Sequence, residues 1–161
     1  MTEGNFSFNE IKLKIEHFCA YQDRCVFEIQ TKLQDYNLSK ENQNKLIDYL
    51  VAEKFLDEKR FAESFVSGKF KIKMWGRQKI KQALRLKKVD EQLIQTAIFS
   101  IDDDDYLRVV RNLIVKKWNE LSREKDEWIK KSKTIRFLQS RGFESDIILS
   151  EFKTLKESQV I

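Results

Sequence analysis

Residues 56–89 read LDEKRFAESFVSGKFKIKMWGRQKIKQALRLKKV. The beginning of this stretch mixes acids and bases, but no Asp or Glu occurs between Ser64 and Val89. That acid-free window contains Trp75 and nine basic residues, namely Lys69, Lys71, Lys73, Arg77, Lys79, Lys81, Arg85, Lys87 and Lys88. Without these nine, the 31 Lys and Arg fall to 22 against 26 Asp and Glu, a formal charge of −4. The basicity of the chain is therefore local.

A local excess of cations favours binding to a polyanion, because each neutralised phosphate releases condensed counterions. The alternative is an exposed helix face that Lys and Arg keep solvated. Solvated faces usually interleave both signs of charge, and this segment does not. We therefore predict that the nine cations and Trp75 form a binding surface. A second basic cluster is interspersed with acids and is interpreted as an ordinary solvated face; it comprises Lys116, Lys117, Lys125, Lys130, Lys131, Lys133 and Arg136.

The overall composition predicts an all-helical protein. Proline is absent, only four glycines occur in 161 residues, and 41% of the residues are hydrophobic. This combination favours helices with few breaks. No apolar run approaches the roughly 20 residues of a membrane span. The first residues, MTEGNFSFNE, lack the basic-then-apolar order of a signal peptide, so we expect a soluble, cytoplasmic protein.

Cys19 and Cys25 are the only cysteines, and they do not suffice for a disulfide scaffold in a chain of this length. Together with His17 they offer three candidate metal ligands, but a structural zinc site needs four. We interpret both as buried structural thiols and His17 as a packed residue. No nucleophile–base set or glycine-rich phosphate loop occurs, so we expect neither catalysis nor a cofactor or metal.

Apolar residues at helical spacing predict helices that start at polar caps. The first is expected over 9–22, and the second begins at Asp23 and ends near Asn37. Further helix starts are predicted at Ser39, Asp57, Gly76, Asp90, the acidic run 102–105, the region before Trp128, and Glu144. We interpret the acidic run as a helix N-terminus, where carboxylates cap free N–H groups and oppose the macrodipole. Trp128 is placed on the apolar face of its helix together with Ile135 and Leu138.

One joint recurs three times along the chain: Leu33-x4-Leu38, Leu84-x4-Val89 and Leu138-x4-Phe143. Asn37, Lys88 and Gly142 precede the last residue of each joint. Asn and Gly tolerate positive φ, whereas Lys88 would be strained there by about 1 kcal/mol, so a different turn is expected in the middle joint. The repeat predicts an elongated array of three tandem three-helix units. The expected boundaries are a tail over 1–8 and repeats over 9–55, 56–101 and 102–161.

Two segments also carry a resemblance to a known family. Residues 55–66, FLDEKRFAESFV, resemble the signature of the RecX regulatory proteins, a leucine followed by Asp-Asp/Glu-x-Arg-Phe-Ala and a further aromatic residue. Residues 76–84, GRQKIKQAL, are similar to the basic helix of that family. Lys88 stands where the family commonly has glycine, so this turn departs from the family pattern.

The resemblance implies a bacterial regulator of the RecA recombinase, active in DNA repair, recombination and the SOS response. Such proteins bind the RecA–DNA filament and suppress ATP hydrolysis, strand exchange and filament growth. The family fold is an open, curved stack of three three-helix repeats. The implied partners are RecA filaments and single- and double-stranded DNA, bound by a monomer without sequence preference and away from membranes.

Two alternatives stay open at the level of sequence. Trp75 could stack on an exposed base or plug a contact between helices beside Met74. The chain could also be a stand-alone helix-turn-helix module that reads base edges with Arg77, Gln78 and Gln82.

Overall fold

The computed structural model describes residues 6–161, and in this range it contains α-helices and no strand. The first unit comprises α1 (Phe8–Tyr21), α2 (Val26–Leu33) and α3 (Lys40–Ala52). The second comprises α4 (Glu58–Lys71), α5 (Arg77–Leu86) and α6 (Glu91–Phe99). The third comprises α7 (Asp103–Glu120), α8 (Glu127–Ser140) and α9 (Ser145–Glu157).

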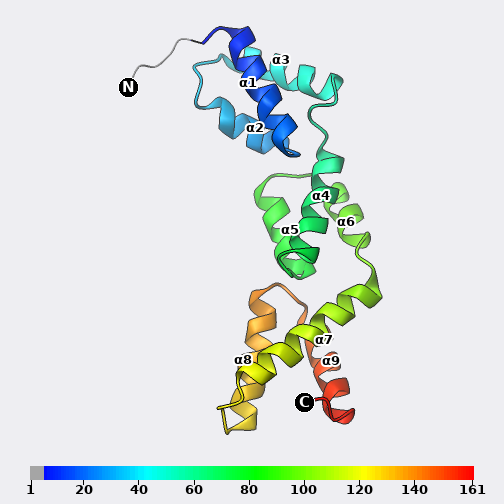
Figure 1. Cartoon of the computed structure of the whole chain (residues 1–161). Coiled ribbons are helices and arrows are strands. Elements are labelled where there is room, and N and C mark those ends of the chain that lie inside the picture. The colour runs from blue at the N-terminus through cyan, green and yellow to red at the C-terminus, as the bar shows by residue number, and fades with distance from the viewer. Residues whose placement is uncertain (1–5) are drawn as a thin grey trace.

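The three units follow one another along the length of an elongated molecule (Figure 1). The predicted all-helical array of tandem three-helix units is therefore confirmed. Of the expected tail over 1–8, residues 1–5 lie outside the described residues, and α1 already begins at Phe8. None of the helices within residues 6–161 combines the length and the apolar character needed to cross a membrane.

Side chains at the helix starts satisfy the backbone N–H groups that no helical carbonyl reaches. Ser7 and Glu10 form a reciprocal capping box at the start of α1. Asp57 accepts a hydrogen bond from the N–H of Arg60 at the start of α4. In the acidic run, Asp102 accepts one from the N–H of Asp105, so this run is a helix N-terminus as predicted.

The buried residues form two hydrophobic cores. The first unit has its own core, in which Ile15, Ile29 and Leu50 have no exposed surface. The second and third units share one continuous core that extends from Phe61 in α4 to Leu155 in α9 and also takes in Cys25 from the loop before α2. Because a shared core resists bending more than a surface contact does, we expect α4–α9 to move as one body.

Tyr106 of α7 links the second and third units in this shared core. Its ring packs against Phe70 and Phe143, with centroids 5.7 and 5.3 Å away. Its hydroxyl donates to Glu144 at 2.5 Å and accepts from the N–H of Arg77 at 3.0 Å. Burial raises the pKa of Tyr106, and the hydrogen bond to the Glu144 carboxylate raises it further, so the hydroxyl stays protonated.

The turns contradict the expectation about the three joints. Lys88 has a φ of 55°, and the N–H of Val89 bonds to the carbonyl of Leu84. The third joint forms the equivalent bond from Phe143 to Leu138, with Gly142 at a φ of 90°. The middle joint thus keeps the turn of the third one despite its lysine. It is the first joint that differs, because α2 ends at Leu33 and Asn37 is not at positive φ.

Three further expectations are corrected. Asp23 does not cap α2; Cys25 occupies the cap position, and Asp23 binds residues of α4 instead. His17 is exposed, because it lies two residues from both Ile15 and Cys19 and so faces away from the core. Trp128 is 75% exposed in the first turn of α8 and does not belong to an apolar face. Cys19 and Cys25 are free and buried, as expected of structural thiols.

Candidate nucleic-acid interface

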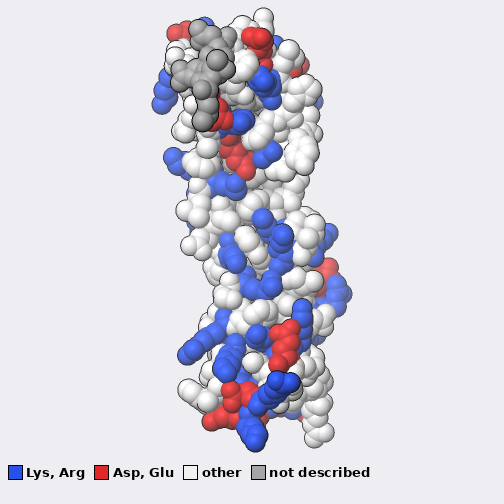
Figure 2. All heavy atoms as spheres, turned by 60° about the vertical axis from the view of Figure 1, so that its left-hand side comes forward, with Lys and Arg blue, Asp and Glu red and all other residues white. Residues whose placement is uncertain are grey.

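The predicted basic surface lies on α4, on α5 and on the turns that follow them. Figure 2 shows Lys and Arg gathered over the middle of the molecule, whereas acids and bases mix above and below. Helix periodicity separates the cations of α5 into two rows, because residues four apart share a face. One row contains Arg77, Lys81 and Arg85. The other row continues from Trp75 through Lys79 and Ala83 to Lys87.

Acids from neighbouring helices pair with Arg77 and Arg85 of the first row and leave Lys81 without a salt bridge among residues 6–161. The Arg77 guanidinium pairs with Asp103 at 2.6 Å and lies 3.9 Å from the centre of the Tyr106 ring. Arg85 pairs with Glu91 at 2.7 Å. The Arg85 hydrogen bond holds the pKa of Glu91 down to about 2, so this carboxylate stays charged at neutral pH. Two cations that the sequence places in an acid-free window are therefore neutralised by partners outside it.

The second row is only partly neutralised. Lys87 pairs with Glu28 of α2 at 2.7 Å, and both side chains are largely buried. Within residues 6–161, no salt bridge is formed by the remaining six predicted cations, Lys69, Lys71, Lys73, Lys79, Lys81 and Lys88. Free positive charge is thus carried by three groups of lysines: those at the end of α4 and just after it, one on each row of α5, and one in the turn after α5. They are Lys69, Lys71 and Lys73, then Lys79 and Lys81, and then Lys88.

Trp75 lies at the edge of the shared core and also lines a surface groove between α4 and α5. Its ring is partly buried and packs against the core. The ammonium groups of Lys69 and Lys79 lie 4.7 and 4.6 Å from its ring centre. The packing role that the sequence allowed for Trp75 is present, and base stacking by its ring stays a prediction.

The third unit holds the turn between α4 and α5 in place. Arg141 donates to the carbonyl of Lys73 at 2.7 Å, and Lys79 donates to the carbonyl of Ser140 at 3.4 Å. Sequence reasoning missed Arg141, whose only local signal is its position before Gly142. These bonds tie the basic surface to the α8–α9 turn, so the surface is formed before any ligand binds.

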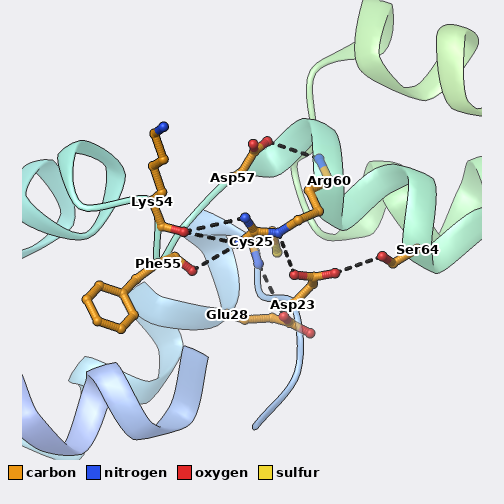
Figure 3. A network of polar contacts seen from close by, with 8 residues as sticks. All are labelled: Asp23, Cys25, Glu28, Lys54, Phe55, Asp57, Arg60 and Ser64. Carbon is orange, nitrogen blue, oxygen red and sulfur yellow. Dashed lines mark hydrogen bonds and ion pairs between the residues drawn. The ribbon is translucent and has the colours of Figure 1, made fainter. Parts of the chain in front are cut away.

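Asp23 and Arg60 form the centre of a polar network that joins the first and second units (Figure 3). Their side chains pair at 2.7 Å, and Ser64 donates to the other carboxylate oxygen of Asp23. Arg60 also donates to the carbonyls of Lys54 and Phe55. A single guanidinium thereby connects α4, the α3–α4 link and the loop before α2.

Comparison with known proteins identifies the family of this chain. Residues 57–98 match the family model for the second three-helix domain of RecX, and residues 103–150 match the model for the third. The chain belongs to the RecX family. The regulatory protein RecX of Acinetobacter baylyi is 35% identical over 130 residues, which cover 81% of this chain and 78% of the relative.

Two other curated RecX proteins match over a smaller share of their length. The Clostridium botulinum protein is 35% identical over 75% of this chain, and the Lactobacillus johnsonii protein is 26% identical over 81%. The chain spans only 57% and 48% of the lengths of these two relatives. The crystal structure of RecX from Lactobacillus salivarius superposes with a TM-score of 0.83 at 23% identity, covering 92% of this chain and 96% of that one. The three curated relatives are each named regulatory protein RecX.

The RecX-like signature over 55–66 builds the joint between units rather than the basic surface. Asp57 caps α4, and Arg60 forms the polar network with Asp23. Phe61, Ala62 and Val66 are buried in the shared core. Within this signature Arg60 thus ties the first unit to the second, and the buried residues belong to the core of the second and third units.

Proposed function

We propose that this chain binds the DNA-loaded filament of a RecA recombinase and lowers its ATP hydrolysis, strand exchange and extension without catalysing a reaction. The proposal rests on the membership of the RecX family and on one structural observation. Six lysines without an acidic partner among residues 6–161 lie on the second unit, which shares a single core with the third. As a monomer acting in DNA repair, recombination and the SOS response, the protein would work in the cytoplasm.

The cations would contact phosphates or acidic patches along the filament. Phosphate contacts position a protein without reading the base sequence, so binding to single- and double-stranded DNA would be sequence-tolerant. Because α4–α9 share a core, the spacing of the lysines is set before binding. Little conformational freedom of the backbone is therefore lost when the protein binds. A preset surface that spans neighbouring filament subunits would favour one filament geometry over others.

This mechanism requires tighter binding to the assembled filament than to its parts, since a ligand shifts an equilibrium only by its differential affinity. The test titrates the protein into recombinase ATPase reactions on single-stranded DNA and measures its affinity for filament, free recombinase and bare DNA. We expect ATP hydrolysis to fall and the filament to bind most tightly. Equal affinity for all three, with unchanged ATPase activity, would contradict the proposal.

The helix-turn-helix alternative receives support from Gln78 and Gln82, which are exposed on neighbouring turns of α5. Arg77 does not support it, because its guanidinium is already paired with Asp103 and lies over the Tyr106 ring. Footprinting on random and selected DNA separates the two functions. A sequence-specific footprint in the absence of recombinase would favour the stand-alone module.

A further inference from the structure

The groove between α4 and α5 combines apolar walls with a basic rim. Its volume is about 550 Å³, and Phe65, Ile72 and Trp75 supply its apolar surface. This volume falls within the range of about 300–1,000 Å³ that is usual for ligand pockets. Ile72 is 77% exposed although it is apolar, and nothing in residues 6–161 covers it. Ile72 therefore adds a solvent-exposed apolar wall to the groove beside Phe65 and Trp75.

Gly68 opens the floor of this groove. It lies in the last part of α4, and a Cβ built on it meets no atom within 4 Å. Glycine inside a helix costs about 0.5–1 kcal/mol relative to alanine. Packing does not explain this glycine, because the space above it is empty. The absence of a side chain does, however, keep the space between Phe65 and Ile72 free.

The charge of the groove selects an acidic ligand. Lys69 and Lys73 line it and form no salt bridge within residues 6–161, and the Lys79 ammonium lies over Trp75 beside them. The one carboxylate in the lining, that of Glu28, is already paired with Lys87. The lining therefore offers two lysines without a salt bridge among residues 6–161, whereas its one carboxylate is already neutralised.

We propose that this groove docks a short acidic segment of a partner protein, with one aromatic or large aliphatic side chain held between Phe65, Ile72 and Trp75. Flanking carboxylates would pair with Lys69, Lys73 and Lys79. This docking site rests on the proposed function, which supplies the partner protein. It adds a contact with protein to a surface that is also proposed to contact DNA.

A nucleobase fits the groove less well than such a peptide. The ammonium groups of Lys69 and Lys79 lie over the Trp75 ring, where a stacked base would have to displace them. A carboxylate can pair with the same ammonium groups without displacing them. The polar edge of a base would also face the apolar walls of Phe65 and Ile72, and unpaired polar groups are disfavoured there.

The test uses fluorescence anisotropy with the full chain and a labelled peptide that carries one phenylalanine between two pairs of aspartates. Two matched peptides replace either the phenylalanine by serine or the aspartates by asparagines. We expect each replacement to weaken binding by about tenfold, from the lost apolar burial in one case and the lost ion pairs in the other. Only the parent peptide and the serine peptide should show salt-dependent binding.

The variant Gly68→Leu fills the groove, and Ser67→Leu, at an exposed position of α4 outside the groove lining, is its matched control. Both should fold, because a Cβ on Gly68 meets open space and Ser67 is exposed. We expect Gly68→Leu to weaken parent-peptide binding by about tenfold and Ser67→Leu to leave it nearly unchanged. Unchanged peptide binding by Gly68→Leu would overturn the inference.

A labelled oligothymidine measured in parallel distinguishes a nucleotide site from a peptide site. If Gly68→Leu weakens oligothymidine binding but not peptide binding, the groove holds bases and the inference is wrong. The peptide assay contains neither DNA nor recombinase, so it fails independently of the proposed function. Absent peptide binding together with lowered recombinase ATPase would refute the inference alone.

Discussion

Gly76 and Gly142 lie backbone to backbone where the second and third units meet. A Cβ on Gly76 would stand 2.3 Å from the carbonyl carbon of Gly142, and one on Gly142 would stand 2.3 Å from the Cβ of Lys79. Two hydrogen bonds cross this contact, from Gly76 to Arg141 at 2.7 Å and from Gln78 to Gly142 at 3.0 Å. Such a close approach leaves no room for a side chain at either glycine.

We therefore predict that Gly76→Ala lowers the free energy of unfolding by about 2–3 kcal/mol, because the added methyl group forces the two turns apart. Gly68→Ala, in open space on the same unit, should instead stabilise the protein by about 0.5–1 kcal/mol. Urea denaturation of the two variants measures both values. Equal effects at the two glycines would show that the close contact does not form in solution.

The strained turn at Lys88 gives a second prediction. Its φ of 55° disfavours a side chain, so Lys88→Gly should raise the free energy of unfolding by about 0.5–1 kcal/mol. Lys88→Ala removes the same charge but keeps the strain and should bring no gain. Thermal denaturation should show a rise of a few degrees for the glycine variant alone.

The joint between the first and second units should depend on pH. Hydrogen bonds from Ser64 and Arg60 lower the pKa of Asp23 below its ordinary value of 3.8. Because the pKa of Asp23 is lower in the folded protein, its ionised carboxylate stabilises the fold fully at pH values above 3.8. This stabilisation is lost as the pH falls through the lowered pKa of the folded protein. We expect Asp23→Asn to cost about 1 kcal/mol at pH 7 and much less near pH 2. Urea denaturation at both values tests this, and an equal loss at each would contradict it.

The free lysines should set the salt dependence of DNA binding. Replacing Lys69, Lys73 and Lys79 together by glutamine should reduce the slope of log K against log salt by about 2–3, since each phosphate contact contributes about 0.7–0.9. A control replaces the exposed Lys40, Lys116 and Lys125, which removes the same net charge elsewhere. Filter binding at several salt concentrations measures the slope for each triple variant. Equal slopes for the two variants would place the phosphate contacts on another surface.

The two thiols should be unreactive in the native protein. Burial raises the pKa of Cys19 to about 11 and also raises that of Cys25, so little of the reactive thiolate exists near pH 8. We expect a disulfide reagent at pH 8 to label neither thiol quickly until urea is added, after which both should react. Rapid labelling of Cys19 in buffer alone would show that the first unit opens readily, because Cys19 lies in the core of that unit.

Helix starts and ends could be predicted from the sequence because capping depends on residues only a few positions apart. Asp57 and Asp102 cap helices in the structure as their spacing predicts, and Gly142 ends α8. The turn at Lys88 was mispredicted because the sequence shows only its local strain. Val89 and Leu84 hold this turn in place, and both pack in the shared core, which the sequence does not show. Asp23 was misplaced for a similar reason, since its partner Arg60 lies 37 residues away.

The sequence by itself determined that the chain is helical, that it repeats three times, that it resembles RecX and that its cations concentrate in one segment. These properties depend on residue type and spacing along the chain. Only the tertiary structure decided which cations remain free. Asp103 and Glu28 reach Arg77 and Lys87 from 26 and 59 residues away, and ion pairing depends on distance in space rather than in sequence.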